Sequence, residues 1–502
     1  MAKVHDSATD LITFARSSSG TALRRIGYGD ELVDNGEFET DILNWSAVGG
    51  GASVAWDSGP QRMQVTAGAG FEGALQTLSL TSGKVYVLSC DYVRGSVSQV
   101  RLAAQGFSGQ PAATGTAASG SLEVIAVAGV TNNVRVDAGG STGDFYVDNI
   151  SVKEVIFDRA TDPLVLFNHP DDIPRIEYGS DGSLKGLLIE EQRANLLTHS
   201  TPDAVTPTNW GALSGSGTRT LTTLSNGLSA LRFQATSERP YIQQAVTLNA
   251  NTTYTLSVYV EAGYTAGARP VLLISNLGGT TGTTQASLGS EDSNGRISVT
   301  FTTGSDVSGF IRYGLGTDTN DTGDVTLGGM QLEAGSFATS YIPTSGSQET
   351  RWADVASIPV SAFGYNQDAG TVVVEASAYA GNPINANYCS FGNAALTDFI
   401  RLWTWEGDTS SVRWTGTNFD VTRSFMAGTT EVMAGAYAEN NYNIALDGSA
   451  ATPDTAGAQT LDATLVYLGS KTGATEFLNG HIKSIQYYPR RLTNTQLQEL
   501  TS

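Results

Sequence analysis

The stretch Ile173–Leu197 reads IPRIEYGSDGSLKGLLIEEQRANLL and separates two long parts of the chain that are rich in Gly, Ser and Thr. The glycines around Asp181 are turn signals, and the apolar run Leu187–Ile189 predicts a buried strand. Glu190 and Glu191 are adjacent, so on a strand they face opposite sides and cannot form a catalytic pair with each other. The stretch therefore predicts a connector that packs between domains.

The composition predicts an all-β protein. A chain of 502 residues suggests about three domains. Charged residues make up only 15% of the chain, against about 25% in an average protein, and 57 residues are glycine. Low charge together with many turn-forming and β-branched residues favours sheets joined by turns.

The net charge of −21 restricts the class of partner. Binding to nucleic acid requires clustered Lys and Arg to displace counterions, and an anionic membrane surface requires the same. We therefore expect no nucleic acid and no membrane insertion, and no sequence window approaches the roughly 18 apolar residues of a membrane span. Neutral glycans and Ca²⁺ remain compatible with an acidic β protein.

The N-terminal residues lack the apolar core of a signal peptide. Cys90 and Cys389 fall in different predicted domains, so we expect neither a disulfide nor a cysteine-based metal site.

The sequence contains an internal repeat, which predicts two modules of one fold. Residues 254–260 alternate between apolar and polar side chains, the period of a half-buried strand. Three sets of residues match between the modules at similar spacing: Asn44-Trp45 with Asn209-Trp210, Gln76 with Gln244, and Tyr86 with Tyr254. In this register Cys90 takes the inward position of Val258 and is interpreted as a small core residue.

Two pieces of the chain resemble a passage that recurs in structural proteins of tailed bacteriophages. The first piece is FARSS at Phe14–Ser18, and the second is PRIEY…GLLIEEQR within Pro174–Arg193. In that family the two pieces lie close together, whereas roughly 150 residues separate them here. We therefore interpret Glu31–Val155 as an inserted module.

The inserted module resembles carbohydrate-binding modules with a jelly-roll fold, through its opening VDNGEFETDILNW and its close GDFYVDNISVKEV. The C-terminal part resembles laminin-G or concanavalin-like sandwiches, through GTVVVE, NIALDG and NGHI…YYPRRL. The predicted fold is all-β, with three tandem β-sandwiches: two jelly-roll repeats and a concanavalin/laminin-G-like sandwich. The predicted parts are an anchor (1–30), the inserted jelly-roll (31–155), a connector that completes the anchor (156–197), the second jelly-roll (198–344), a linker (345–350) and the last sandwich (351–502).

The jelly-roll resemblance implies a structural calcium ion that ties the N-terminal segment of the module to its last strand. The matching positions are Glu37, Glu39 and Asp148. Gly328 stands where Asp148 aligns in the second module, which puts an equivalent site there in doubt. The alternative is that Asp148 only accepts hydrogen bonds from turn amides. No other cofactor is expected.

Aromatic side chains are the candidates for sugar binding, because neutral sugars lie against flat rings and hydrogen-bond to nearby polar groups. The candidates are Trp56, Tyr241, Trp403, Trp405 and Trp414. Trp403 and Trp405 fall on one face of a strand, and the alternative is that they line a core. Trp45 and Trp210 repeat between the modules and are interpreted as shared packing.

The sequence offers no catalytic motif that its context supports. Runs similar to GxSxG occur only in strand and loop context, and the ExDxxE pattern of concanavalin-like glucanases is absent. The four histidines are scattered, without zinc-binding spacing. We therefore expect that the protein is not an enzyme.

The phage resemblance implies a virion structural protein, a tail fibre, head fibre or spike, made in the host cytoplasm and incorporated into the virion. It would display glycan-binding modules for adsorption to the bacterial surface, where repeated weak sites add up through effective concentration. The expected partners are a bacterial surface glycan, other virion proteins through the N-terminal anchor, and further copies of the chain, for which a trimer is one arrangement. Two alternatives stay open: a purely architectural decoration or connector protein, and a capsule-degrading depolymerase.

Overall fold

The computed structural model describes residues 11–214, 217–235, 240–261, 270–275, 295–305, 307–315, 323–379, 385–393, 399–405, 408–416, 419–424, 431–456 and 462–502. The chain separates into two compact units, Arg25–Pro163 and the remainder, Met1–Arg24 with Leu164–Ser502. The described residues form antiparallel sheets packed as sandwiches, so the predicted all-β sandwich class is confirmed.

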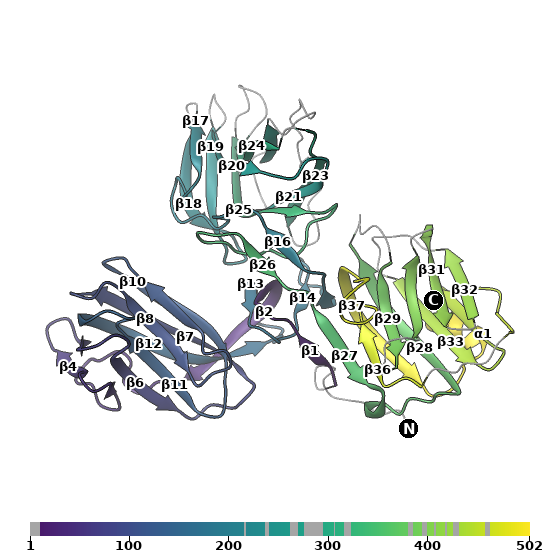
Figure 1. Cartoon of the computed structure of the whole chain (residues 1–502), viewed down its shortest axis with the longest axis horizontal. Coiled ribbons are helices and arrows are strands. Elements are labelled where there is room, and N and C mark those ends of the chain that lie inside the picture. The colour runs from purple at the N-terminus through teal and green to yellow at the C-terminus, as the bar shows by residue number, and fades with distance from the viewer. Residues whose placement is uncertain are drawn as a thin grey trace. The chain divides into compact units, whose positions relative to one another are not determined.

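The unit Arg25–Pro163 is a sandwich of two antiparallel sheets, drawn in purple and blue in Figure 1. One sheet has the order β10-β7-β12-β5-β4, with β2 beside the C-terminal half of β12, and the other has the order β3-β6-β11-β8-β9. The strands are β2 (Gly20–Glu31), β3 (Ser46–Val48), β4 (Ser53–Asp57), β5 (Arg62–Ala67), β6 (Gly73–Leu78), β7 (Val85–Arg94), β8 (Val100–Gln105), β9 (Ala112–Gly115), β10 (Ser119–Val127), β11 (Asn132–Asp137) and β12 (Gly143–Phe157).

A second sandwich follows the connector, with sheets of order β18-β19-β25-β21-β23 and β17-β20-β24-β22. Its strands are β17 (Gly211–Ser214), β18 (Thr218–Thr223), β19 (Ser229–Ala235), β20 (Pro240–Thr247), β21 (Thr253–Val260), β22 (Pro270–Ser275), β23 (Arg296–Thr302), β24 (Ser308–Leu315) and β25 (Gly323–Ala334). Leu256 and Ile311, from opposite sheets, lie in one buried core.

The first and second sandwiches share a frame of side-chain hydrogen bonds at the aligned positions. The indole of Trp45 donates to the Asn35 carbonyl, and that of Trp210 donates to the His199 carbonyl. The phenol oxygens of Tyr86 and Tyr254 each accept a hydrogen bond from the backbone N–H five residues earlier. Cys90 and Val258 are both buried in their cores. The interpretation of the repeated tryptophans as packing residues therefore agrees with their burial.

The C-terminal sandwich incorporates both pieces of the phage-like passage as strands. FARSS supplies β1 (Thr13–Ala15), which pairs with β27 at the edge of one sheet. The stretch Ile173–Leu197 supplies β14 and β15, and β15 pairs with β37 of the other sheet. The connector therefore extends a sheet of the last sandwich, and Leu188 and Ile189 are fully buried there as the apolar run predicted.

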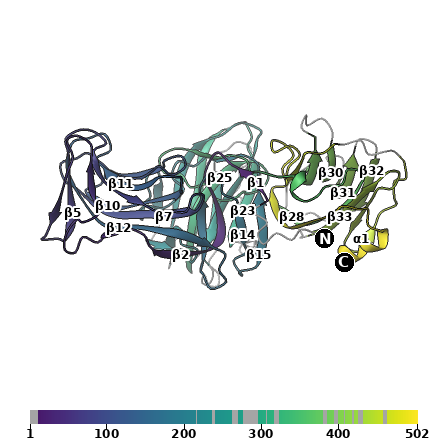
Figure 2. The ribbon, with the colours of Figure 1, turned by 90° about the horizontal axis from the view of Figure 1, so that it is seen from below.

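The remaining elements belong to the connector, the linker and the last sandwich, whose strands Figure 2 shows from below. They are β13 (Leu164–His169), β14 (Ile176–Tyr178), β15 (Leu184–Ile189), β16 (Arg193–Asn195), β26 (Glu349–Arg351), β27 (Val355–Pro359), the 3-10 turn η2 (Val360–Ala362), β28 (Ala369–Ala378), β29 (Asn387–Gly392), β30 (Phe399–Trp405), β31 (Asp408–Gly416), β32 (Phe419–Ser424), β33 (Glu431–Ala438), β34 (Asn443–Leu446), β35 (Ser449–Ala450), β36 (Leu465–Leu468), β37 (Gly480–Tyr488) and the helix α1 (Asn494–Leu500).

Two short sequence signals set the ends of elements in the last sandwich. Thr493 caps α1 and forms a capping box with Gln496. Asp447 and Gly448 both have positive φ and form the turn between β34 and β35. No helix within the described ranges is long and apolar enough to cross a bilayer.

Candidate functional site

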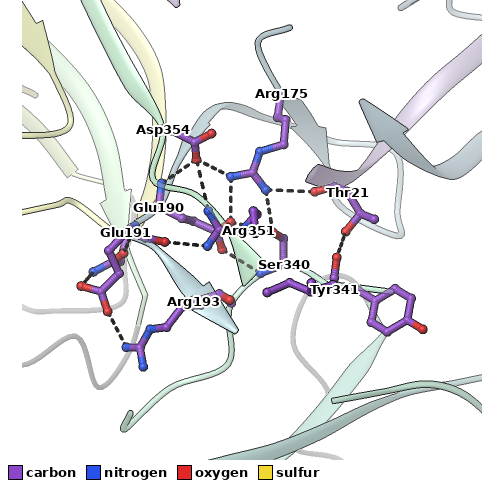
Figure 3. Close-up of polar contacts among 12 residues, drawn as sticks. Thr21, Arg175, Glu190, Glu191, Arg193, Ser340, Tyr341, Arg351 and Asp354 are labelled. Carbon is purple, nitrogen blue, oxygen red and sulfur yellow. Dashed lines mark hydrogen bonds and ion pairs between the residues drawn. The ribbon is translucent and has the colours of Figure 1, made fainter. Parts of the chain in front are cut away.

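A buried cluster of charges holds the connector, and Arg175 of the PRIEY segment lies at its centre (Figure 3). The Arg175 guanidinium forms ion pairs with Asp354 and, at 2.8 Å, with Glu190. It also donates to the Thr21 carbonyl at 3.1 Å and to the Ser340 hydroxyl at 2.6 Å. Arg175 is fully buried, and protein groups rather than water accept from its two terminal nitrogens, whereas its Nε has no partner among the described residues.

Arg16 of FARSS joins the same cluster from the other end of the passage. Its guanidinium lies 3.1 Å from Asp354 and donates to the Pro170 carbonyl at 2.9 Å. Arg351 lies 3.4 Å from the Glu190 carboxylate and donates to the Glu191 carbonyl at 2.8 Å. The two sequence pieces, separated in the chain, are thus joined by one set of buried ion pairs.

Burial and charge oppose each other in this cluster. Burial alone would raise the pKa of Glu190, but Arg351, Arg175 and the hydrogen bonds from Ser340 hold it well below its usual value. Burial lowers the pKa of Arg16 to about 10, although Asp354 opposes the shift. Removing one partner of a buried ion pair costs about 3–5 kcal/mol, because the other charge is left uncompensated. The cluster therefore fixes the connector in one arrangement.

Two buried histidines lie in the same unit. Burial, together with Arg24, Arg16 and Arg175, lowers the pKa of His169 well below its usual value, so the ring is neutral at pH 7. His481 lies 2.6 Å from Glu177 and joins β37 to β14. Both rings serve packing and hydrogen bonding between the connector and its neighbours.

The residues predicted to bind calcium lie in one region of the first sandwich. Asp148 pairs in register with Asp91, and burial, Asp91 and Glu37 raise the pKa of its carboxyl group. The Glu39 carbonyl accepts a hydrogen bond from Gln61. Across the described residues no group of three or more His, Cys, Asp or Glu side chains is arranged to hold a metal. A calcium ion therefore stays a prediction.

Trp56 and Tyr241 are the sugar-binding candidates with accessible rings. The Trp56 indole donates to the Phe38 carbonyl at 2.8 Å while 39% of the residue stays exposed, so the ring is held in one orientation. This bond places Trp56 beside the segment that carries Glu37 and Glu39. Tyr241 is half-buried on β20, with the Arg312 guanidinium 5.2 Å from its ring centre.

The remaining candidates lie in the C-terminal sandwich. Trp403 is only 7% exposed, and the Arg401 guanidinium lies 3.6 Å from its ring centre. The side chains of Trp405 and Trp414 lie outside the described part of the structure. The described candidates therefore lie one in each sandwich: Trp56 in the first, Tyr241 in the second and Trp403 in the last.

Sequence reasoning missed the charge cluster as a unit. Arg16 and Arg175 each stand in a short apolar context, which is a signal of a buried and paired arginine. Their shared partner Asp354 follows the linker and carried no motif of its own. Beside Tyr241, Arg312 donates to Gln243 at 3.0 Å, a pairing that only the strand register reveals.

Comparisons with known proteins show likeness at the level of solved structures only. No protein-family model matches the chain, and no curated protein matches it. The tandem CBM22-1–CBM22-2 domain of Paenibacillus barcinonensis Xyn10C matches with 15% identity and a TM-score of 0.22, over 61% of this chain and 98% of that one. Trypanosoma rangeli sialidase with the inhibitor DANA matches with 10% identity and a TM-score of 0.24, over 89% and 93%. A mutant of that sialidase with trans-sialidase activity matches with 9% identity and a TM-score of 0.25, over 97% of each chain.

One expectation from the sequence is corrected here. We expected a protein that is not an enzyme, but sialidases, which are enzymes, are among the structures that the chain matches. The expectation that the protein is not an enzyme is therefore withdrawn. At these TM-scores the likeness identifies no reaction and no catalytic residue.

Proposed function

We propose that the chain is a structural protein of a tailed-phage virion, a tail fibre, head fibre or spike, that displays glycan-binding sandwiches. The observation that carries this proposal is the convergence of Arg16 and Arg175 on Asp354. These arginines belong to the two pieces that resemble the phage passage. Their joining by buried ion pairs across the long insertion supports a shared role for the two pieces as the anchor.

Glycan binding is the part of the proposal that rests on the aromatic side chains. Trp56 has a ring fixed by its hydrogen bond and exposed to solvent, which suits stacking on the C–H face of a sugar. Tyr241 adds a second ring, with Arg312 and Gln243 beside it as hydrogen-bonding groups. Weak sites on separate sandwiches reinforce each other when one polymer reaches both.

A glycan array probed with the full chain tests the binding role. We expect binding to a bacterial surface polysaccharide that Trp56→Ala and Tyr241→Ala each weaken about tenfold, which corresponds to ~1.4 kcal/mol. Trp56→Phe keeps a ring and should retain most of the binding. Trp352→Ala is the matched control, because this tryptophan is 51% exposed but follows β26, outside both jelly-roll sandwiches.

Other outcomes assign the alternatives. No detectable binding at millimolar sugar would contradict glycan display and favour an architectural protein. Release of reducing ends from the polysaccharide would assign depolymerase activity. Immunogold electron microscopy of the phage that encodes the chain tests the virion role, and unlabelled particles would contradict it.

A further inference from the structure

A lysine, a glutamate and an asparagine meet beside β29 in the C-terminal sandwich. The Lys471 ammonium lies 3.1 Å from Oε1 of Glu476. The Asn387 side-chain amide donates to Oε2 of the same carboxylate at 3.1 Å. One carboxylate therefore touches an amine with one oxygen and a carboxamide nitrogen with the other.

The Asn387 carboxamide is held firmly in this position. Asn387 is fully buried, and its Nδ2 also donates to the carbonyls of Asn385 and Glu476 at 3.2 Å. Its backbone N–H donates to the Glu476 carbonyl as well. Glu476 keeps a positive φ of 55°, a conformation that non-glycine residues adopt only when their surroundings impose it. Among the described residues, Oδ1 of Asn387 has no hydrogen-bond partner.

We propose that Lys471 and Asn387 form an intramolecular isopeptide bond, with Glu476 as the proton relay. Oε1 of Glu476 first accepts a proton from the Lys471 ammonium, which frees the lone pair of Nζ, and the neutral Nζ then attacks Cγ of Asn387 and forms a new C–N bond. The carboxyl group delivers that proton from Oε2 to Nδ2, and a second proton passes from Nζ to the departing ammonia. The bond from Cγ to Nδ2 breaks and ammonia leaves, so an ammonium side chain and a carboxamide give a secondary amide and an ammonium ion. No oxidant or other reactant is needed.

Arg401 holds the relay carboxylate of Glu476 in position. Its guanidinium lies 2.5 Å from Oε2 of Glu476, and its other face lies against the Trp403 ring. The carboxylate lies within hydrogen-bond reach of the attacking amine and can accept its proton. The Lys471 and Glu476 side chains are 29% and 21% exposed, so water is partly excluded around the reacting groups.

The same domain contains a natural control pair. Lys483 lies 2.7 Å from Oε1 of Glu375, but Oε2 of that glutamate accepts a hydrogen bond from the Ser484 hydroxyl at 3.4 Å. A hydroxyl offers no acyl carbon, so Lys483 cannot react in this way. The chemistry therefore depends on the carboxamide, and a lysine–glutamate pair alone is insufficient.

Mass spectrometry of the purified full chain tests the proposal. We expect the intact mass to be lower than the sequence mass by about 17 Da, the mass of ammonia. Trypsin should yield a branched peptide joining residues 352–401 to residues 424–483, because a modified Lys471 is not cleaved. Lys471→Arg and Glu476→Gln should restore the full mass, whereas Lys483→Arg should keep the loss.

The wild-type protein by itself decides the question, even where a variant fails to fold. An unshifted intact mass together with separate linear peptides would overturn the proposal. A loss of about 17 Da that persists in Lys471→Arg would also overturn it, because another residue would then be the nucleophile.

Discussion

In the first sandwich the bulge of the long strand β12 carries Asp148 and Asn149, whereas the same bulge of β25 in the second sandwich carries Gly328 and Gly329. Asn149 and Gly329 both have positive φ, 50° and 64°. Asp148 pairs with Asp91, and Gly328 pairs with Tyr259. The backbone geometry is therefore common to both sandwiches, while the acidic character belongs to the first alone.

The matched glutamines, Gln76 in the first sandwich and Gln244 in the second, differ in their hydrogen-bond partners. Gln76 accepts from the Asp34 N–H and donates to the Asp34 carbonyl, at 2.9 and 2.8 Å. Gln244 accepts from the Thr198 N–H at 3.1 Å, but its Nε2 has no partner among the described residues. The Thr198 carbonyl instead accepts from Gly346 in the linker. The shared frame has thus been altered where the linker meets the second sandwich.

The largest expected effect comes from the tryptophans of the shared frame. Trp45→Ala and Trp210→Ala should each lower the free energy of unfolding of their own sandwich by about 3–5 kcal/mol, because each removes a buried indole. Chemical denaturation followed by tryptophan fluorescence and circular dichroism measures the loss. A loss below about 1 kcal/mol in either variant would break the equivalence of the two sandwiches.

Replacement of the matched glutamines by methionine should cost more stability in the first sandwich than in the second. Gln76→Met should cost about 1–3 kcal/mol, because it removes two hydrogen bonds to the Asp34 backbone. Gln244→Met should cost under about 1 kcal/mol, because it also removes an unpaired buried donor. Equal losses, measured by urea denaturation of the two variants, would mean that Gln244 has a partner equivalent to Asp34.

The bulge glycine should matter more than the bulge asparagine. Gly329→Ala should lower the unfolding free energy by about 1–2 kcal/mol, because its Cβ would stand 2.6 Å from a Leu228 methyl group at positive φ. Asn149→Gly should change it by less than about 0.5 kcal/mol, because glycine adopts this backbone freely. Thermal melts of both variants measure the difference. A Gly329→Ala variant that melts at the wild-type temperature would contradict the equivalence of the bulges.

The smallest expected effect is the pH dependence at Asp148. Its pKa is raised in the folded state by burial, Asp91 and Glu37, so folding favours the protonated carboxyl group. The stability linked to this group is full below its unfolded pKa of about 3.9 and is lost as the pH rises through the higher folded value. Asp148→Asn should therefore stabilise the first sandwich at pH 7 by a few tenths of a kcal/mol, after solvent screening of this half-exposed site.

Denaturation at pH 7 and pH 4 checks this last prediction. The advantage of Asp148→Asn should shrink on acidification, since the wild-type carboxyl group then becomes neutral too. If Asp148→Asn were less stable than the wild type at pH 7, the folded protein would stabilise the ionised Asp148 carboxylate, as a bound cation would.

The sandwiches were predictable because their signals are local and repeated. The alternation around Leu256 predicts the strand, but not that Thr255 and Ser257 on its other face are buried as well. The matched Trp, Gln and Tyr positions predict a common register. The charge cluster was not predictable, because Arg16 and Asp354 meet only after the sheets have assembled. The exposure of Trp403 was not predictable either, because strand periodicity gives the face of the residue but not the packing of Arg401 over its ring.

The pairing of β1 with β27 affects how the nascent chain acquires its structure. Arg16 leaves the ribosome 338 residues before its partner Asp354. At about 5–20 residues per second, the arginine waits on the order of 20–70 s for that carboxylate. The first strand must therefore remain unpaired throughout most of synthesis, and the last sandwich closes only after translation of its final strands.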